Sequence, residues 1–255
     1  MRAWAIFKKE LRVYFSSPIA YAVLTIFALI SGWFFYNVFA FYVVASMQAA
    51  MNPMMARDMS VIEGVLRPLF QNMSVIMLLM MPILTMRLFS EEKKSGTIEL
   101  LLTYPVRDGE VLLGKYLAAL AVFVAMLAIT LAYPLIMAWV TPLELGPLAT
   151  GYLGLLLQGA AFIAIGILIS SLTENQIVAA VATFGTLLIF WVIAWASDSA
   201  GGNLGRILSH VSLTEHFDSF SQGVIDTKDL IYYLDLTILA LFLTLRSLDS
   251  KRWRG

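Results

Sequence analysis

Residues 19–42 read IAYAVLTIFALISGWFFYNVFAFY, and they lie inside a longer run, residues 13–56, that contains no Asp, Glu, Lys or Arg. A helix of about 20 apolar residues crosses the hydrocarbon core of a bilayer, which is about 30 Å thick. This stretch is therefore long enough for one crossing and leaves no charge in the lipid. It predicts a transmembrane helix. The run is too long for the apolar region of a cleaved signal peptide, and its basic flank begins well inside the chain.

Further apolar stretches predict spans over residues 69–86, 116–140, 150–172, 177–196 and 230–248. Hydrophobic residues make up 60% of the chain and charged residues 13%, and the mean hydropathy is +0.83. These values lie outside the range of soluble domains. We therefore expect an all-α polytopic membrane protein, with six transmembrane helices in a single domain over residues 1–255. Cysteine is absent, which excludes disulfides and Cys-ligated metal sites.

The distribution of basic residues predicts the orientation. If six spans alternate across the membrane, thirteen of the seventeen Lys and Arg residues fall on the side that holds both termini, and four on the other side. Lys and Arg are enriched on the cytoplasmic side of membrane proteins. We expect both termini to be cytoplasmic, residues 87–115 to form a cytoplasmic coupling segment, and residues 198–229 to form an extracytoplasmic loop.

Residues 1–17 predict an amphipathic helix that lies on the membrane surface before the first span. At about 100° per residue, apolar and basic side chains separate onto two faces. Such a helix can form an interfacial elbow, and an ordinary basic flank that only sets topology is the alternative. The apolar face holds Trp4, Phe7, Leu11, Tyr14 and Phe15, and the basic face holds Arg2, Lys8, Lys9 and Arg12.

The connector after the second span carries the most specific signal, RLFSEEKKSGTIELLLTYP over residues 87–105. Ser90 can start a short helix with acidic residues in its first turn, and Gly96 breaks that helix. A second short turn follows and stops before Pro105. A charged piece of this kind can dock on another protein, and a solvated loop is the alternative.

With this connector, the sequence resembles the permease subunits of ABC-2 type transporters. The resemblance rests on Arg-Leu-Phe, Glu-Glu and Gly-Thr-x-Glu-Leu-Leu-Leu-Thr-x-Pro-Val in the connector, followed by Gly114-Lys115, and it covers essentially the whole chain. Together with the connector, SLTENQIVAA at residues 171–180 and GVIDTKDLIYY at residues 223–233 look most like the gliding-motility (GldF-like) branch.

The resemblance implies a half-transporter rather than an enzyme. It implies two copies of a separate ATPase that bind ATP and Mg, and a second permease copy, as a homodimer or with a paralogue. It also implies a location in the bacterial cytoplasmic (inner) membrane, with surrounding lipids and a GldG-like periplasmic auxiliary protein as partners. It implies no nucleic-acid partner and no cofactor bound by this chain itself. Export or mechanical transmission would be driven through a coupling helix in residues 88–105. The residues implied are Glu91, Glu92, Lys93, Lys94, Gly96, Thr97, Glu99, Leu100 and Pro105, with a smaller contact at Thr173, Glu174, Asn175 and Gln176.

One motif points to ATP binding by this chain and is rejected on its context. Residues 109–115 match most of the phosphate-binding pattern G-x-x-x-x-G-K-[ST], but Tyr116 replaces the hydroxyl residue. No strand is expected before the run, and a membrane span follows it directly. We expect no nucleotide site here.

Polar residues inside the spans are candidates for a translocation path. Asp235 is the only acid at clear membrane depth, and such residues usually face a bundle interior or a wet cavity. One hypothesis is that it lines or gates an outward vestibule; the alternative is a carboxylate that reaches the outer headgroups or bonds Tyr232 or Tyr233. The other candidates for the path are Gln71, Asn72, Thr183 and Thr186. The alternative for these four residues is that they form hydrogen bonds between helices.

Two further functions remain open from the sequence. The first is a copper-site maturation (NosY-like) permease, because thioethers suit Cu(I), although Met stripes usually serve packing. The Met stripe consists of Met47, Met51, Met54, Met55 and Met59. The second is a non-transporting scaffold that recruits an accessory protein through residues 43–67 and 198–229. His210 and His216 are spaced unlike a metal pair, and we expect residues 204–220 to form short amphipathic helices that cap the path.

Overall fold

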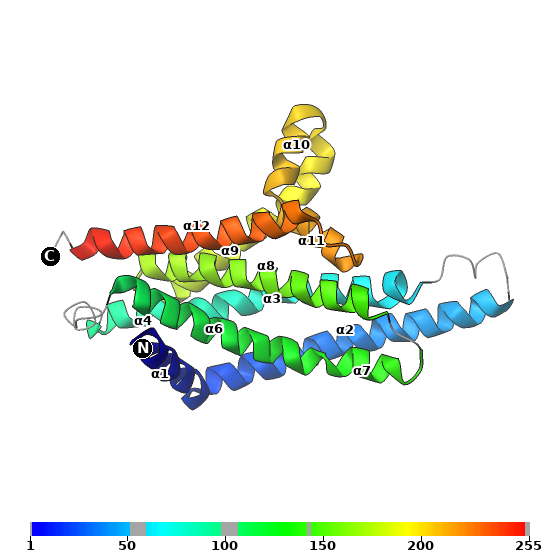
Figure 1. Ribbon diagram of the computed structural model, residues 1–255, viewed down its shortest axis with the longest axis horizontal. Helices are drawn as coiled ribbons and strands as arrows, with labels where there is room; N and C mark the ends of the chain where they lie inside the picture. Colours follow the sequence, from blue (N-terminus) through cyan, green and yellow to red (C-terminus); the bar gives the residue numbers. More distant parts are fainter. Residues whose placement is uncertain (1, 52–59, 98–106, 142–143, 253–255) are drawn as a thin grey trace.

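The computed structural model describes residues 2–51, 60–97, 107–141 and 144–252, and this part of the chain is helical without strands (Figure 1). The elements are α1 (Arg2–Ser16), α2 (Pro18–Met51), a π-helical turn (Ile62–Leu66), α3 (Arg67–Thr85), α4 (Arg87–Lys94), α6 (Asp108–Thr130), α7 (Ala132–Ala138), α8 (Leu145–Leu172), α9 (Gln176–Ala200), α10 (Gly202–Val211), α11 (Leu213–Ser221) and α12 (Thr227–Arg252).

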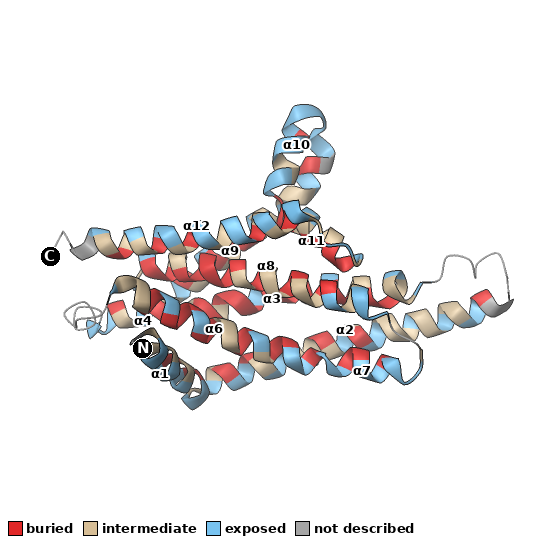
Figure 2. Cartoon of the chain, viewed as in Figure 1, coloured by how far each residue is buried: buried red, intermediate tan, exposed pale blue. Residues whose placement is uncertain are grey.

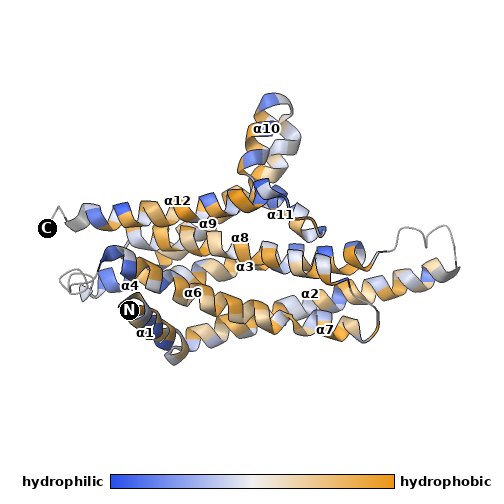
Figure 3. Ribbon diagram, in the orientation of Figure 1, coloured by the Kyte–Doolittle hydropathy of each residue, from blue (hydrophilic) through white to orange (hydrophobic). Residues whose placement is uncertain are grey.

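Six helical stretches of the described residues are long and apolar enough to cross a membrane, which confirms the predicted all-α, six-span fold. They are Pro18–Ala49, Ile62–Lys94, Asp108–Ala138, Leu145–Leu172, Gln176–Ser197 and Thr227–Ser250. Figure 3 shows apolar colour along most of these helices, with polar colour on α1, α4, α10 and α11 and at the ends of α12.

The helices run past the ends that the apolar pattern predicts. Helix α2 continues to Met51, and α6 begins at Asp108 rather than at residue 116. The backbone of Arg107 donates to Glu110 Oε2 at 3.1 Å, so this polar start of α6 is capped. The third span also bends at Leu131 into α7, because Pro134 lacks the N–H that would continue the α6 ladder. Apolar residues therefore located the spans but not their ends.

The centre of the bundle is formed by α3 and α8 (Figure 2). In the most apolar window of each span, 72% of residues are buried in the stretch that contains α3 and 67% in α8, against 17% in α9 and in α12. Glycines allow α8 to approach its neighbours. A Cβ on Gly166 would lie 2.1 Å from Thr85 Oγ1, and one on Gly151 would lie 2.1 Å from a ring carbon of Phe70. Small residues are thus what let these apolar helices pack closely.

Both ends of the described chain lie at one end of the bundle, together with α4 (Figure 1). We call this the terminal end, and we call the end that holds the far part of α2 the opposite end. The predicted loop at residues 198–229 is largely helical: α9 extends into it, and α10 and α11 confirm the expected short helices at residues 204–220. Helix α10 projects sideways from the bundle (Figure 1).

The predicted N-terminal helix is present as α1, but it packs on the protein. Tyr14 is buried, Phe7 and Leu11 pack against the core, and Trp4 remains exposed. The main contact of α1 is with α6. The apolar face that the sequence assigned to lipid therefore serves in large part to dock α1 on the bundle.

Candidate functional site

Helix α4 follows α3 after a single turn residue, Met86, and is bonded to α8 at that joint. It begins at Arg87, not at Ser90 as predicted. The hydroxyl of Ser170 on α8 accepts from the backbone N–H groups of Phe89 and Ser90, each at 3.1 Å, and donates to the carbonyl of Met86 at 2.9 Å. One side chain thus satisfies backbone groups in the first turn of α4 and fixes that helix to α8.

Lys93 gives α4 a second attachment to α8. Its side chain is buried, and its Nζ donates to the carbonyl of Ser171. Lys93 therefore faces α8, and not the ATPase as predicted. This is possible because the long aliphatic part of a lysine can lie across the packed face of a short helix while its ammonium group reaches a carbonyl of the next helix.

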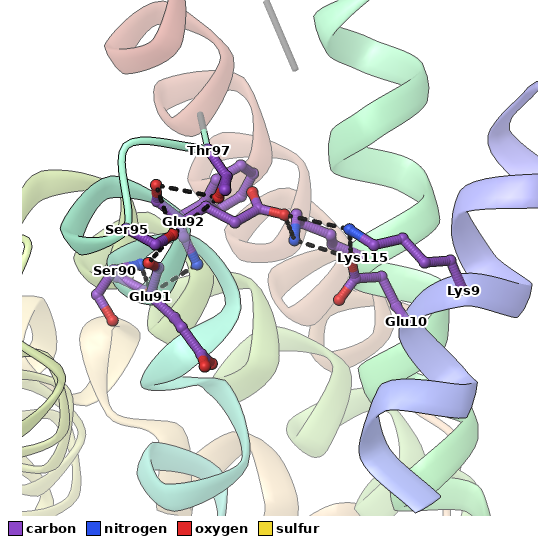
Figure 4. Close-up of polar contacts among 10 residues, drawn as sticks. Lys9, Glu10, Ser90, Glu91, Glu92, Ser95, Thr97 and Lys115 are labelled. Atoms are coloured by element: carbon purple, nitrogen blue, oxygen red, sulfur yellow. Dashed lines mark hydrogen bonds and ion pairs between the residues drawn. The ribbon is translucent and has the colours of Figure 1, made fainter. Parts of the chain in front are cut away.

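Four charged residues form an ion cluster that joins α1, α4 and α6 (Figure 4). Lys115 Nζ lies 3.1 Å from Glu10 Oε1 and 2.8 Å from Glu92 Oε1. Lys9 Nζ lies 3.2 Å from Glu10 Oε1 and 3.6 Å from Glu92 Oε1. The side chain of Lys115 is only 2% exposed, whereas that of Lys9 is 58% exposed. Glu92, predicted to face the ATPase, instead points to Lys115, because a buried cation requires nearby counter-charge.

Close approach of α1 to α6 places Glu10 in the ion cluster. A Cβ on Gly114 would lie 2.7 Å from Ile6 Cγ2 and 3.0 Å from the carbonyl oxygen of Ala3, so only glycine leaves this space. Burial lowers the pKa of Lys9, but the carboxylates of Glu10 and Glu92 outweigh that effect and raise the pKa above its ordinary value.

A second set of contacts joins α1 to the α3–α4 joint. The hydroxyl of Tyr14 donates to the carbonyl of Leu84 at 2.8 Å, and burial raises the pKa of Tyr14. The guanidinium of Arg87 lies 5.5 Å from the centre of the Tyr14 ring and donates to Ser17 Oγ at 3.1 Å. Helix α1 is therefore fastened on both sides of the ion cluster.

A cavity of about 290 Å³ opens beside the ion cluster. Within the described residues, Glu92 Oε2 is buried without a hydrogen-bond partner. A polar group that enters this cavity would meet charges of both signs, whereas the buried Glu92 Oε2 is not accessible to it. The charged residues that line it are Lys9, Glu10, Arg87, Glu91, Glu92 and Lys115.

The exposed part of α4 is the surface open to a partner. Glu91, Lys94, Gly96 and Thr97 are exposed. Gly96 has φ +69°, a left-handed conformation that ends the helix, and its N–H donates to the carbonyl of Lys93 at 3.1 Å. Three predicted coupling residues lie outside the described part of the chain: Glu99, Leu100 and Pro105.

The predicted second contact, the turn between α8 and α9, lies at the same end of the bundle, and both of those helices contact α4. Asn175 Oδ1 accepts from the backbone of Ile177 at 2.9 Å, which caps α9. Thr173 and Gln176 are half-buried, and Glu174 is exposed. Capping explains Asn175 structurally and leaves Glu174 as the exposed charge of this turn.

The predicted path residues are not brought together. Thr183 and Thr186 donate to carbonyls of their own helix, and Gln71 donates to Asp218 on α11 at 3.3 Å, near the opposite end. Asn72 is half-buried. Asp235 lies on the exposed side of α12 rather than toward the bundle interior. Its role in a vestibule stays a prediction.

Two other sequence motifs can also be placed. Residues 109–115 lie within α6, with Lys115 in the ion cluster, so the near-match to a phosphate-binding pattern forms no loop that could hold phosphate. Met47 is exposed on the far part of α2, and Met51 is the last residue of that helix. The rest of the Met stripe, Met54, Met55 and Met59, lies outside the described residues.

The fold and this site define a multi-pass membrane protein with a short charged helix docked at one end of its bundle. Residues 4–246 match the family described as ABC-2 family transporter protein. The chain therefore belongs to the ABC-2 transporter family, whose permeases are generally non-enzymatic membrane components that associate with an ABC ATPase. No curated protein matches the chain.

Proposed function

We propose that this chain is the permease subunit of an ATP-binding cassette transporter and that α4 receives the movement of a separate ATPase. The observation that supports the proposal is the way α4 is fastened. It follows α3 directly, and it is bonded to α8 through Ser170 and to α1 and α6 through Glu92. A push on α4 would therefore move four helices together.

The charged residues of α4 fall into an exposed pair and a buried pair, which supports separate roles in docking and in transmission. Glu91 and Lys94 are exposed and available to a partner, whereas Glu92 and Lys93 are used inside the subunit. Docking would therefore depend on Glu91, Lys94 and the exposed Glu174, and transmission would depend on the ion cluster.

The wider assembly follows the family resemblance. We propose two ATPase copies that bind ATP and Mg, a second permease copy or paralogue, and a bacterial cytoplasmic membrane with both termini inside. Within the family, the gliding-motility (GldF-like) branch is our proposal, with a GldG-like auxiliary protein as its periplasmic partner. This chain would supply no cofactor and would transmit force or export a substrate.

The test is a charge swap on the exposed side of α4, Glu91→Lys combined with Lys94→Glu, which leaves the net charge unchanged. We expect the ATPase that co-purifies from native membranes to be lost, because docking charges on a rigid helix would meet like charge. The matched control is Asp226→Lys with Lys228→Glu, which exchanges an exposed ion pair outside the coupling site and should leave co-purification intact.

Two results would count against the proposal. One is full recovery of the ATPase with the α4 charge swap and with Glu174→Lys. The other is the absence of any ABC ATPase from purified native complexes, which would favour the scaffold function instead.

A further inference from the structure

Helix α12 has one packed face and one free face, and Asp235 lies on the free one. Tyr233 and Ala240 are buried against the bundle, where α12 contacts mainly α8. Asp235 follows Tyr233 by two residues, which places it about 200° around the helix. It is exposed, as are the apolar residues Ile238 and Leu239 beyond it. Between Lys228 and Arg246, which are also exposed, the free face is therefore apolar except for one carboxylate.

Asp235 lies within the apolar part of its helix, more than one turn inside the predicted span. The predicted span that contains it runs over residues 230–248, and Asp235 is the sixth residue of that span. At about 1.5 Å per residue, Asp235 lies about 8 Å from the first residue of that span and about 20 Å from the last, so it is inside a hydrocarbon core of about 30 Å. Its side chain is shorter than those of Lys and Arg, which reach the interface by snorkelling. An ionised group at this depth needs a partner.

The neighbouring hydroxyls do not supply that partner. Tyr232 donates to the carbonyl of Val211 at 2.7 Å, and Tyr233 donates to that of Leu213 at 2.8 Å. Thr237 donates to the carbonyl of Tyr233. Across the described parts of the chain, no hydrogen bond or ion pair involves the Asp235 carboxylate. The alternative that it bonds Tyr232 or Tyr233 is therefore wrong for this conformation.

A second copy of this chain lacks the group that would neutralise Asp235. None of the seventeen Lys and Arg residues lies in the central part of a predicted span. Lys115, the most deeply buried of them, is held by Glu10 and Glu92 at the terminal end. The two His residues lie in α10 and α11, outside the candidate spans. A complementary cation at the depth of Asp235 must come from a different polypeptide.

We infer that the free face of α12 binds a transmembrane helix of another protein, and that this helix carries a Lys or Arg at the depth of Asp235. The face offers a shallow groove of about 500 Å³ with one acidic group in apolar surroundings, which suits an apolar helix with a single basic residue. The groove is lined by Tyr232, Asp235, Leu236, Ile238, Leu239 and Phe242. This inference goes beyond the coupling function and does not depend on it, because α4 lies at the terminal end.

The experiment is site-specific photo-crosslinking in native membranes. Benzoylphenylalanine replaces Ile238, one turn from Asp235, and as a control it replaces Leu29, an equally exposed apolar residue of α2. We expect a protein adduct of one defined mass at position 238 and not at position 29. The adduct should fall about tenfold with Asp235→Asn, the size of one interhelical polar contact, and should persist with Asp235→Glu.

The decisive step is a charge exchange between the two chains. Asp235→Lys should abolish the adduct, and replacing the basic residue of the captured helix with Asp should restore it. Membrane levels and ATPase co-purification should be the same in all Asp235 variants, which separates this result from failed folding and from failure of the coupling proposal. The inference is overturned if position 238 gives only lipid adducts, if the captured protein is a second copy of this chain, or if Asp235→Asn leaves the adduct unchanged.

Discussion

Lys115 is a buried cation whose charge is balanced by two carboxylates, Glu10 and Glu92. Replacing it with methionine would keep the length of the side chain and remove its charge. The two carboxylates would then share a largely buried site without their main counter-charge. We predict that Lys115→Met lowers the free energy of unfolding by about 3–5 kcal/mol, the usual cost of breaking a buried ion pair on one side. The thermal midpoint of the purified protein in detergent measures this loss.

A matched control is Lys94→Met, which removes an exposed charge from α4 and should change stability by no more than about 0.5 kcal/mol. Adding Glu10→Gln and Glu92→Gln to Lys115→Met should recover most of the loss, because neutral amides replace the unpaired carboxylates. Equal midpoints for Lys115→Met and Lys94→Met would show that the ion cluster does not stabilise the fold.

The sequence identified the acidic pair of the connector but not the roles of its members. Glu91 and Glu92 are adjacent, so they point in directions about 100° apart on a helix, and only the position of Lys115 decides which one is internal. Glu10 carried a weak signal that was missed, and Lys115 was noted only as part of the Gly114-Lys115 motif. Glu10 is the one acid in a basic N-terminal segment, and Lys115 is a lone charge beside an apolar span. Their pairing joins residues far apart in sequence and is visible only once α1 is docked on α6.

At the scale of elements, the α3–α4 joint depends on α8. Pro82 removes one N–H from the last turns of α3, and Ser170 supplies the hydroxyl that accepts from the backbone of α4 after the joint. The connector sequence alone predicted a helix start at Ser90, because its capping residue was sought within the connector. The group that satisfies this turn comes from another span, which local sequence patterns do not reveal.

The docking of α1 on α6 gives a direct test with two glycines of the same helix. A methyl group at Gly114 would meet Ile6 and the backbone of Ala3, whereas one at Gly109 would meet open space. We predict that Gly114→Ala destabilises the protein by about 1–3 kcal/mol, as overpacking does. Gly109→Ala should be neutral or stabilising by up to about 1 kcal/mol, because alanine favours helix.

Thermal midpoints of the two alanine variants measure this difference, and ATPase co-purification shows whether α1 docking also supports the coupling site. If both variants behave alike, the close contact between α1 and α6 is absent in the membrane. The comparison removes the general effect of a Gly→Ala change, since both residues lie in α6.

At the scale of the whole molecule, hydropathy predicted the number of spans but not how the spans pack against one another. Each span is apolar around most of its circumference, so the pattern does not say which face packs and which meets lipid. The central place of α3 and α8 follows from glycines such as Gly151 and Gly166, whose contacts are tertiary. Polar ends such as the start of α6 at Asp108 also remain helical although they do not look like membrane residues.

The orientation of the whole bundle can be measured directly because the chain contains no cysteine. Single cysteines at Ser95 and Ser60 would lie at exposed positions on opposite sides of the second span, because Ser95 follows α4 and Ser60 precedes the π-helical turn that leads into α3. The excess of Lys and Arg at the terminal end predicts that it faces the cytoplasm. A membrane-impermeant maleimide should therefore label Ser60→Cys in spheroplasts and should label Ser95→Cys only after the membrane is permeabilised. Labelling of both variants in permeabilised membranes is the control for reactivity. Labelling of Ser95→Cys in intact spheroplasts would place α4 outside, where no cytoplasmic ATPase could reach it, and the coupling function would have to be abandoned.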